Sequence, residues 1–312
     1  MIRNAVFAAG LILLSLQSAW PNGEGEVVVS IAPIHSLVKE VMGESGDPIL
    51  LLRGYASPHS FQLKPSQLRK MHSARAVFYV SKSFETFLIR SFNGLPSSVA
   101  KISLMDASNI EIRPYREGGA WAVHEEEAHH HETLEGRDDH AFDDDPHIWL
   151  DPENAVTIVR QIEGELGKLF PENKALYGAN AKTLVAKIQS MDKRLTEKLA
   201  PVLTMPFVVF HDSYQYFEKH YGLRAVGSIL LEPKSSPSIA RLQEIRAKIK
   251  ETKAKCIFRE PQFSDKLVRT ASEGSTIKSG LLDPLGSDLP QGVGLYIGLM
   301  ETLADAMVSC LK

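Results

Sequence analysis

Short apolar runs alternate with helical patterns along most of the chain. The apolar runs predict buried strands over 27–33, 48–52, 76–80, 101–105, 206–210, 225–229, 256–260 and 277–281. Amphipathic or capped segments predict helices over 36–42, 66–72, 84–91, 174–199, 213–221, 238–252, 265–270 and 293–310, with another beginning at Asp151. Strands that alternate with helices build βαβ units, so the pattern predicts an α/β fold with parallel sheets.

Three helix starts carry recognisable capping residues. Ser66 and Ser238 each stand at the start of a helical pattern and predict N-caps. Asp151 is followed by Pro152, which fits an N-cap and a proline in the first turn of the next helix.

The longest helical pattern, 174–199, would be about 38 Å long, enough to cross a whole domain. We therefore expect two Rossmann-like lobes, 26–170 and 201–312, joined by a long helix within 171–200. The cleft between the lobes is the expected ligand site.

The start of the chain indicates secretion. Arg3 precedes an apolar run over 5–16, which fits a secretory signal peptide within residues 1–25 and is too short to span a membrane. Cleavage is expected near Ala19, and an uncleaved N-terminal anchor is the alternative. No Cys lies nearby, which excludes a bacterial lipoprotein anchor. We expect a periplasmic location.

The charge of the chain bears on its partners and is unevenly distributed along the sequence. The net charge of −3 gives no reason to expect binding to nucleic acid or to an anionic membrane. The stretch 124–145 holds ten Asp and Glu, one Arg and five His, so it carries −9 and leaves +6 for the remainder. It has no periodicity and predicts a surface loop.

Histidines stand where the predicted strands end. His59 lies in the loop after the second strand, His147 at the entry to a helix, and His211 directly after a strand, while Asp283 follows the last strand. Residues just past the carboxyl ends of parallel strands line the ligand crevice of α/β sheets. Three imidazoles with a carboxylate or a water suit Zn²⁺, and Glu260 is close enough to the expected cleft to hydrogen-bond a ligand imidazole. Each histidine taken singly could instead be structural.

The histidines of the acidic loop suggest two roles. His124, His129, His130, His131 and His140 could collect metal weakly near the cleft mouth. The alternative is a solvated insertion that only aids solubility.

The chain has two cysteines, Cys256 and Cys310. In an oxidising compartment such a pair predicts a disulfide that links the last helix to a strand of the C-terminal half. Two buried free thiols are the alternative, and neither cysteine has metal-ligand spacing.

Five motifs resemble those of the metal-specific solute-binding proteins of ABC importers, and among them the ZnuA-type zinc receptors. They are GYASPHSFQLKPSQ (54–67), DPHIWLDPENA (145–155), FHDSYQYFEKHYGL (210–223), EPQFS (260–264) and LDPLG (282–286). The resemblance implies a zinc receptor, monomeric and not an enzyme, that delivers Zn²⁺ to a membrane permease. It implies that His59, His147, His211 and Asp283 form the metal site, with Asp283 or a water as fourth ligand.

The residue at position 211 distinguishes family members that bind zinc from those that bind manganese or iron. In family members that bind manganese or iron the corresponding position is usually a carboxylate, and in zinc members it is usually histidine. Imidazole also favours Zn²⁺ over Mn²⁺ on chemical grounds. Histidine must be neutral to bind, so acid should release the metal.

Three other functions compete with this interpretation. One is a metal-independent adhesin or interaction module, in which the placement of the histidines would be accidental. A receptor for Mn²⁺ or Fe²⁺ is disfavoured by His211. A secreted zinc hydrolase would need a general base beside a zinc-bound water, and the chain has no His-Glu-x-x-His, Gly-x-Ser-x-Gly or Walker A motif.

Overall fold

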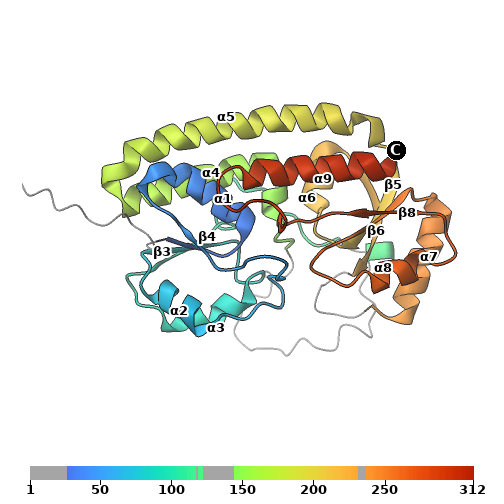
Figure 1. Ribbon diagram of the computed structural model, residues 1–312, viewed down its shortest axis with the longest axis horizontal. Helices are drawn as coiled ribbons and strands as arrows, with labels where there is room; N and C mark the ends of the chain where they lie inside the picture. The colour runs from blue at the N-terminus through green and yellow to red at the C-terminus, as the bar shows by residue number, and fades with distance from the viewer. Residues whose placement is uncertain (1–26, 117–118, 122–143, 231–236) are drawn as a thin grey trace, which may run out of the picture.

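The computed structural model describes residues 27–116, 119–121, 144–230 and 237–312 (Figure 1). They include two sheets of four parallel strands each, which confirms the predicted α/β fold. The first sheet contains β1 (Val27–Val29), β2 (Ile49–Leu50), β3 (Ala76–Tyr79) and β4 (Ala100–Ser103). The second contains β5 (Pro206–His211), β6 (Arg224–Leu230), β7 (Cys256–Arg259) and β8 (Lys278–Leu281).

The two sheets have the same topology. Their strand orders are β2-β1-β3-β4 and β6-β5-β7-β8, so the second strand of each set pairs with the first at one edge. All pairings are parallel. Because the strand order is the same, the loops that follow the central strands lie at the corresponding place in each lobe.

Helices cover both faces of each sheet. In the first lobe these are α1 (Ala32–Met42), α2 (Pro65–His72), α3 (Thr86–Gly94) and α4 (Pro152–Leu169). In the second they are α6 (Gln215–Tyr221), α7 (Ile239–Thr252), α8 (Lys266–Ser272) and α9 (Leu295–Leu311).

Side-chain alternation along the strands explains the layers. In β3, Phe78 packs in the large core shared with α1, α4 and α5, whereas Val77 and Tyr79 pack with residues of α2 and α3 on the other face. In β5, Phe207 and Val209 face the large core in the same way. The apolar runs that form β1, β3 and β5 are therefore strands buried on both faces.

Helix α5 (Lys174–Leu199) runs along both lobes (Figure 1). Its 26 residues match the predicted helix at both ends and give a length of about 39 Å. It packs against α1 and α4 of the first lobe and α9 of the second, and α1 and α9 also pack on each other. Glu40 of α1 links these helices, since its carboxylate contacts Lys187 of α5 and the backbone N–H of Gly294 before α9, each at 3.0 Å.

Two of the three predicted N-caps are present. The carboxylate of Asp151 accepts from the backbone N–H of Glu153, and the side chain of Ser238 accepts from that of Arg241. The expectation for Ser66 is wrong, because α2 begins one residue earlier at Pro65. Proline is well suited to a first helical turn, where its missing N–H leaves no bond unmade.

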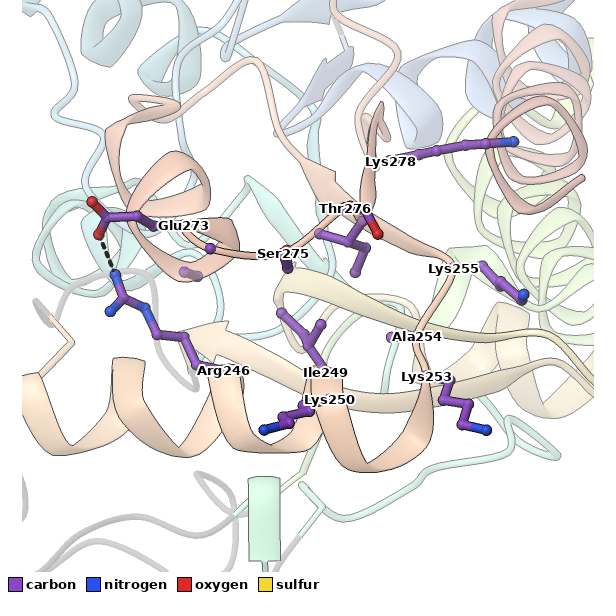
Figure 2. A pocket seen from close by; sticks show the side chains of 13 residues that line it. Arg246, Ile249, Lys250, Lys253, Ala254, Lys255, Glu273, Ser275, Thr276 and Lys278 are labelled. Carbon is purple, nitrogen blue, oxygen red and sulfur yellow. Dashed lines mark hydrogen bonds and ion pairs between the residues drawn. The ribbon is translucent and has the colours of Figure 1, made fainter.

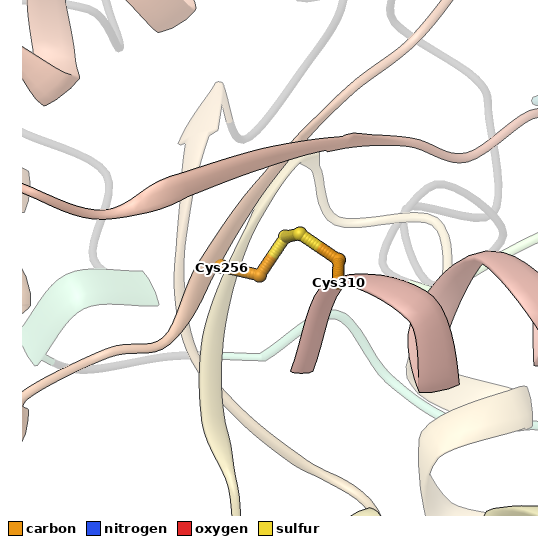
Figure 3. The surroundings of a disulfide bond; sticks show 2 residues. All are labelled: Cys256 and Cys310. Carbon is orange, nitrogen blue, oxygen red and sulfur yellow. A yellow bond between two sulfur atoms is a disulfide. The ribbon is translucent and has the colours of Figure 1, made fainter. Parts of the chain in front are cut away.

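Cys256 and Cys310 form a disulfide that joins β7 to α9 (Figure 3). Both cysteines are buried, and the link closes a segment with a sequence separation of 54. The predicted connection between the last helix and a strand of the C-terminal half is confirmed, and free thiols are excluded. Within the described residues, no helix is long and apolar enough to cross a membrane.

Candidate metal centre

Three histidines from both lobes converge between the sheets. His59 lies in the loop between β2 and α2, His147 precedes the short helical turn Ile148–Leu150, and His211 ends β5. Their ligand atoms all lie within 4.8 Å of one another. The ring centroids are 5.3 to 6.0 Å apart. Three imidazoles at this separation can bind one ion.

Asp145 fixes the orientation of His147. One carboxylate oxygen accepts both the His147 backbone N–H at 3.0 Å and a hydrogen bond from Nδ1 of the ring at 2.7 Å. A carboxylate can only accept here, so Nδ1 carries the proton and Nε2 presents its lone pair. Burial lowers the pKa of His147 well below its usual range, with repulsion from His211 as a further cause, and this keeps the ring neutral. Burial raises the pKa of Asp145 to about 7.

Glu260 performs the same task for His211. Its carboxylate lies 2.8 Å from Nδ1 of His211, and both side chains are almost completely buried. The Nε2 atom of His211 is buried and has no hydrogen-bond partner among the described residues. A neutral imidazole with its lone pair exposed to a small cavity is the form that binds metal.

The cavity at the histidines has a volume of about 10 Å³, close to what one water molecule occupies. It is lined by Ser57, Pro58, His59, Phe84, His147, Trp149, His211, Glu260, Gln262, Phe263, Pro284 and Leu285. Phe84 packs edge-on against two of the histidines, with ring centroids 5.1 Å from His59 and 5.5 Å from His147. The centre therefore offers space for a single ion inside a largely apolar wall.

Asp283 lies beside the centre and outside the group of three. One of its oxygens accepts from Gln262 at 2.7 Å and from the backbone N–H of Leu285 at 3.0 Å. The other accepts from the backbone N–H of Ser287 at 2.5 Å. The carboxylate thus organises the loop after β8, and the structure does not bring it together with the histidines. Its role as a ligand stays a prediction.

Most of the predicted acidic loop, 124–145, lies outside the described residues. His124, His129, His130, His131 and His140 lie outside the described residues. Asp144 and Asp145, the last two residues of the predicted loop, are ordered parts of the site: Asp144 forms a β-bridge with Pro114, and Asp145 holds His147. The bounds of the predicted loop, 124–145, stay a prediction, and composition did not reveal the pairing of these two aspartates with other residues.

Arg116 holds the segment before this stretch against the second lobe. Its guanidinium pairs with Asp212 and Glu218, both almost completely buried, and lies 3.5 Å from the Trp121 ring centroid. Attraction from the two carboxylates outweighs burial and raises the Arg116 pKa. Asp212 directly follows His211, so this ion-pair network borders the metal centre.

Sequence reasoning missed three contributors to the site: Asp145, Phe84 and Gln262. The Asp-x-His spacing of Asp145 and His147 was a usable signal, since a carboxylate next to a metal-binding histidine is common. For Phe84 and Gln262 no local signal exists, because their positions depend on how distant loops meet.

A wider hollow with different chemistry lies at the amino-terminal ends of β7 and β8 (Figure 2). It has a volume of about 740 Å³, and its charged lining is mostly Arg246, Lys250, Lys253, Lys255 and Lys278, with one carboxylate from Glu273. Clustered ammonium groups repel cations, so this hollow does not compete as the metal site.

Comparison with known proteins assigns the family. The sequence profile described as "ZnuA: Zinc-uptake complex component A periplasmic" matches residues 27–310. The chain belongs to this family. Relatives named "High-affinity zinc uptake system protein ZnuA" include proteins of Brucella suis and Yersinia pestis. The Brucella suis protein is 37% identical, covering 99% of this chain and 98% of the relative. The Yersinia pestis protein is 31% identical, covering 100% and 98%.

Solved structures share the fold of this ZnuA-family chain. A crystal structure of ZnuA superposes with a TM-score of 0.77 at 24% identity, over 92% of this chain and 98% of the other. A zinc-bound variant of AdcAII from Streptococcus pneumoniae gives 0.74 at 26% identity, over 92% and 98%. The laminin-binding protein of Streptococcus agalactiae, described as bifunctional with adhesin and metal-transporting activity, gives a TM-score of 0.74 at 25% identity, over 92% of this chain and 98% of the other.

Proposed function

We propose that the protein is a periplasmic receptor that binds Zn²⁺ through His59, His147 and His211 and delivers it to the membrane permease of an ABC importer. The observation that carries the proposal is the convergence of three imidazoles from both lobes, with ligand atoms within 4.8 Å of one another. Membership of the ZnuA family and the zinc-uptake names of the relatives support zinc as the cargo.

The donor set favours zinc over manganese or iron. Nitrogen from three neutral imidazoles suits Zn²⁺, whereas Mn²⁺ is better served by carboxylates. The two buried carboxylates at the site, Asp145 and Glu260, each bind a histidine ring and act on the ion through it. The alternative of a manganese or iron receptor is therefore not favoured.

The size of the cavity argues for binding rather than catalysis. A hydrolase must place a substrate beside its zinc-bound water. A cavity of about 10 Å³ fits a single ion better than it fits a substrate. We infer that the protein acts as a non-catalytic receptor, and as a monomer in which one chain supplies all of the ligands.

The fourth ligand and the auxiliary loop complete the proposal. Asp283 or a water would fill the fourth position, as the family resemblance implies. The loop histidines would collect metal with lower affinity, because a segment without fixed geometry binds weakly. Deleting residues 124–143 should lower the number of zinc ions bound and keep the tight site; loss of tight binding would show that the loop supplies a ligand to the centre.

The experiment that tests the function is zinc titration of the metal-stripped mature protein by calorimetry with a competing chelator. We expect one tight site, and a loss of affinity of about 100- to 1,000-fold in His211→Ala, because tight zinc sites depend on each of a few ligands. His211→Glu should weaken the preference for Zn²⁺ over Mn²⁺. His72→Ala is the matched control, since His72 is exposed on α2. Unchanged binding in His211→Ala would remove the proposed site.

A further inference from the structure

Asp145, which orients His147, is itself held from two sides. Its backbone N–H donates to the carbonyl of Arg113 at 2.8 Å. One of its carboxylate oxygens accepts from the backbone and from the ring of His147, at 3.0 and 2.7 Å. The other carboxylate oxygen and the backbone carbonyl bind Gln215 and Tyr216, which belong to α6 of the second lobe. A residue of the first lobe is therefore fixed by a helix of the second.

Gln215 binds the carboxylate oxygen that His147 leaves free. Its Nε2 atom donates to Oδ2 of Asp145 at 3.2 Å and to the backbone carbonyl of Pro114 at 3.1 Å. A backbone carbonyl can only accept, so the NH₂ end of the amide faces both partners. Asp145 is completely buried, and a buried carboxylate oxygen without a donor is unfavourable. The amide therefore fixes the orientation of the carboxylate whose other oxygen binds His147.

Tyr216 holds the backbone beside the same carboxylate. Its hydroxyl accepts from the backbone N–H of Arg113 at 2.9 Å and donates to the carbonyl of Asp145 at 2.9 Å. A hydroxyl carries one proton, and Arg113 supplies a donor, so the proton of Tyr216 points to Asp145. The tyrosine ring is buried. One hydroxyl thus joins the two segments of the chain that meet next to His147.

An ion-pair network fastens the first of these segments to the second lobe at another point. Arg116 pairs with Asp212 and Glu218, both almost completely buried. Asp212 stands between His211 and α6 in the sequence. The short stretch that follows β5 therefore supplies one histidine of the centre and also contacts the group that orients another.

On the basis of the proposed zinc-receptor function, we propose that Gln215 and Tyr216 are positioning residues for His147. They act through Asp145, which holds the proton on Nδ1 of the ring and leaves Nε2 free to bind the ion. The second lobe then contributes His211 directly and also sets the tautomer and orientation of a histidine from the first lobe. Zinc affinity depends in this way on the contact of α6 with the segment before His147.

The two oriented histidines differ in where their partners come from. His211 is oriented by Glu260, a residue of its own lobe. His147 depends on Asp145, whose partners come from both lobes. A ligand that is already oriented loses little freedom when the ion binds, so a preorganised site binds more tightly. Loss of the α6 contacts should loosen His147 and leave His211 unchanged.

The first test is the zinc affinity of Gln215→Leu, Tyr216→Phe and the double variant, measured by competition with a chelator. We expect a loss of about 10-fold in each single variant and a larger loss in the double variant, within the range of about 10- to 100-fold seen when the partners of metal-binding histidines are removed. Tyr221→Phe and Gln189→Leu are the matched controls and should bind like the parent. The Tyr221 hydroxyl, also on α6, has no hydrogen-bond partner among the described residues, and Gln189 is exposed on α5.

The second test reads the tautomer of His147 directly. Nitrogen chemical shifts of isotope-labelled histidine side chains in the metal-free protein report which ring nitrogen carries the proton, and His147→Ala assigns the signal. We expect the proton on Nδ1 in the parent and a mixture of tautomers at His147 in the double variant. The signal of His211, which Glu260 orients, should stay unchanged. A purely structural role of α6 would change both signals or neither.

A double-mutant cycle separates action through Asp145 from a direct effect on the ion. In the Asp145→Ala background, Gln215→Leu should lower zinc affinity little further, because the carboxylate through which it acts is gone. Losses that add in full would overturn the proposal. Unchanged affinity with an unchanged His147 signal in the double variant would also overturn it, as would equal changes in the signals of His147 and His211.

The failure of this inference differs from a failure of the receptor function. If His147→Ala abolishes tight binding while the double variant binds like the parent and keeps the His147 tautomer, the zinc site stands and the positioning role is wrong. If His147→Ala itself binds like the parent, the zinc site is wrong and the inference that rests on it is wrong as well. Melting curves of the metal-free variants show whether each protein is folded before its affinity is interpreted.

Discussion

Glu260 stands 49 residues beyond His211 along the chain, yet its carboxylate lies 2.8 Å from Nδ1 of that histidine. The contact joins the end of β5 to the turn after β7, two strands that are neighbours in the second sheet. Parallel pairing thus places a carboxylate from one strand end beside an imidazole from the next.

We expect Glu260→Gln to lower zinc affinity by about 10-fold. Glutamine can still accept the hydrogen bond from His211, but it removes the negative charge that makes the ring a better donor to zinc. Competition with a chromogenic chelator measures the change. Glu251→Gln, on the exposed end of α7, is the control and should bind like the parent. Equal affinity in the Glu260 variant would mean that the contact only orients the ring.

Arg116→Met should destabilise the metal-free protein by about 3 to 5 kcal/mol, the usual result of removing one partner from a buried ion pair. Asp212 and Glu218 would remain buried without their cation. Urea unfolding at pH 7 measures the loss. Arg116→Lys should lower the stability less than Arg116→Met does. Arg269→Met breaks an exposed ion pair with Asp265 and should change the stability little. A small loss in Arg116→Met would show that water or other groups compensate the two carboxylates.

His220 makes stability depend on pH. Burial lowers its pKa, but contacts with Asp151 and Asp192 outweigh burial and raise the value to about 9. An unfolded histidine titrates near 6.5. Protonated His220 therefore stabilises the fold fully below pH 6.5, and this contribution is lost as the pH rises towards 9.

The check is the difference in melting temperature between the parent and His220→Gln, measured without metal at pH 6.0 and at pH 9.5. We expect a clear difference at pH 6.0 that shrinks at pH 9.5. A difference of the same size at both values would assign the effect to packing against Tyr221, whose ring centroid lies 4.7 Å away.

Loss of the disulfide should lower the free energy of unfolding by about 4 kcal/mol. The disulfide restricts the unfolded chain by closing a loop between two residues with a sequence separation of 54. Guanidinium unfolding of the parent with and without a phosphine reductant measures this cost. Cys256→Ala/Cys310→Ala should resemble the reduced parent and should not respond to reductant. A reductant effect that persists in the double variant would have another origin.

Much of the fold follows from local sequence, because the determining forces are local or depend on simple periodicity. The apolar run at 206–210 predicts β5, and α5 begins and ends where its helical pattern does. The strand predicted over 27–33 is right only at its start, because β1 ends at Val29 and α1 begins at Ala32. The placement of His59 and His211 near strand ends was enough to predict that they meet, since parallel strands bring their carboxyl ends to one edge.

The finer chemistry of the site could not be predicted in this way. The direction of the Asp283 carboxylate depends on which backbone N–H groups the loop after β8 presents. Asp145 was hidden in a stretch whose average composition predicts a solvated loop, yet pairing of its neighbour Asp144 with Pro114 places it in the interior. Local pattern carries no information on such contacts between distant segments.

The long helix also bears on affinity. His59 and His147 come from one lobe and His211 from the other, so each lobe alone offers an incomplete set of imidazoles. When a rigid element holds two groups of ligands close together, each group has a high effective concentration at the ion bound by the other. The ion is then bound tightly without any additional contact. Helix α5, packed on both lobes, is that rigid element. Separated halves of the chain should therefore chelate zinc far more weakly than the intact protein, although every ligand is still present in the solution.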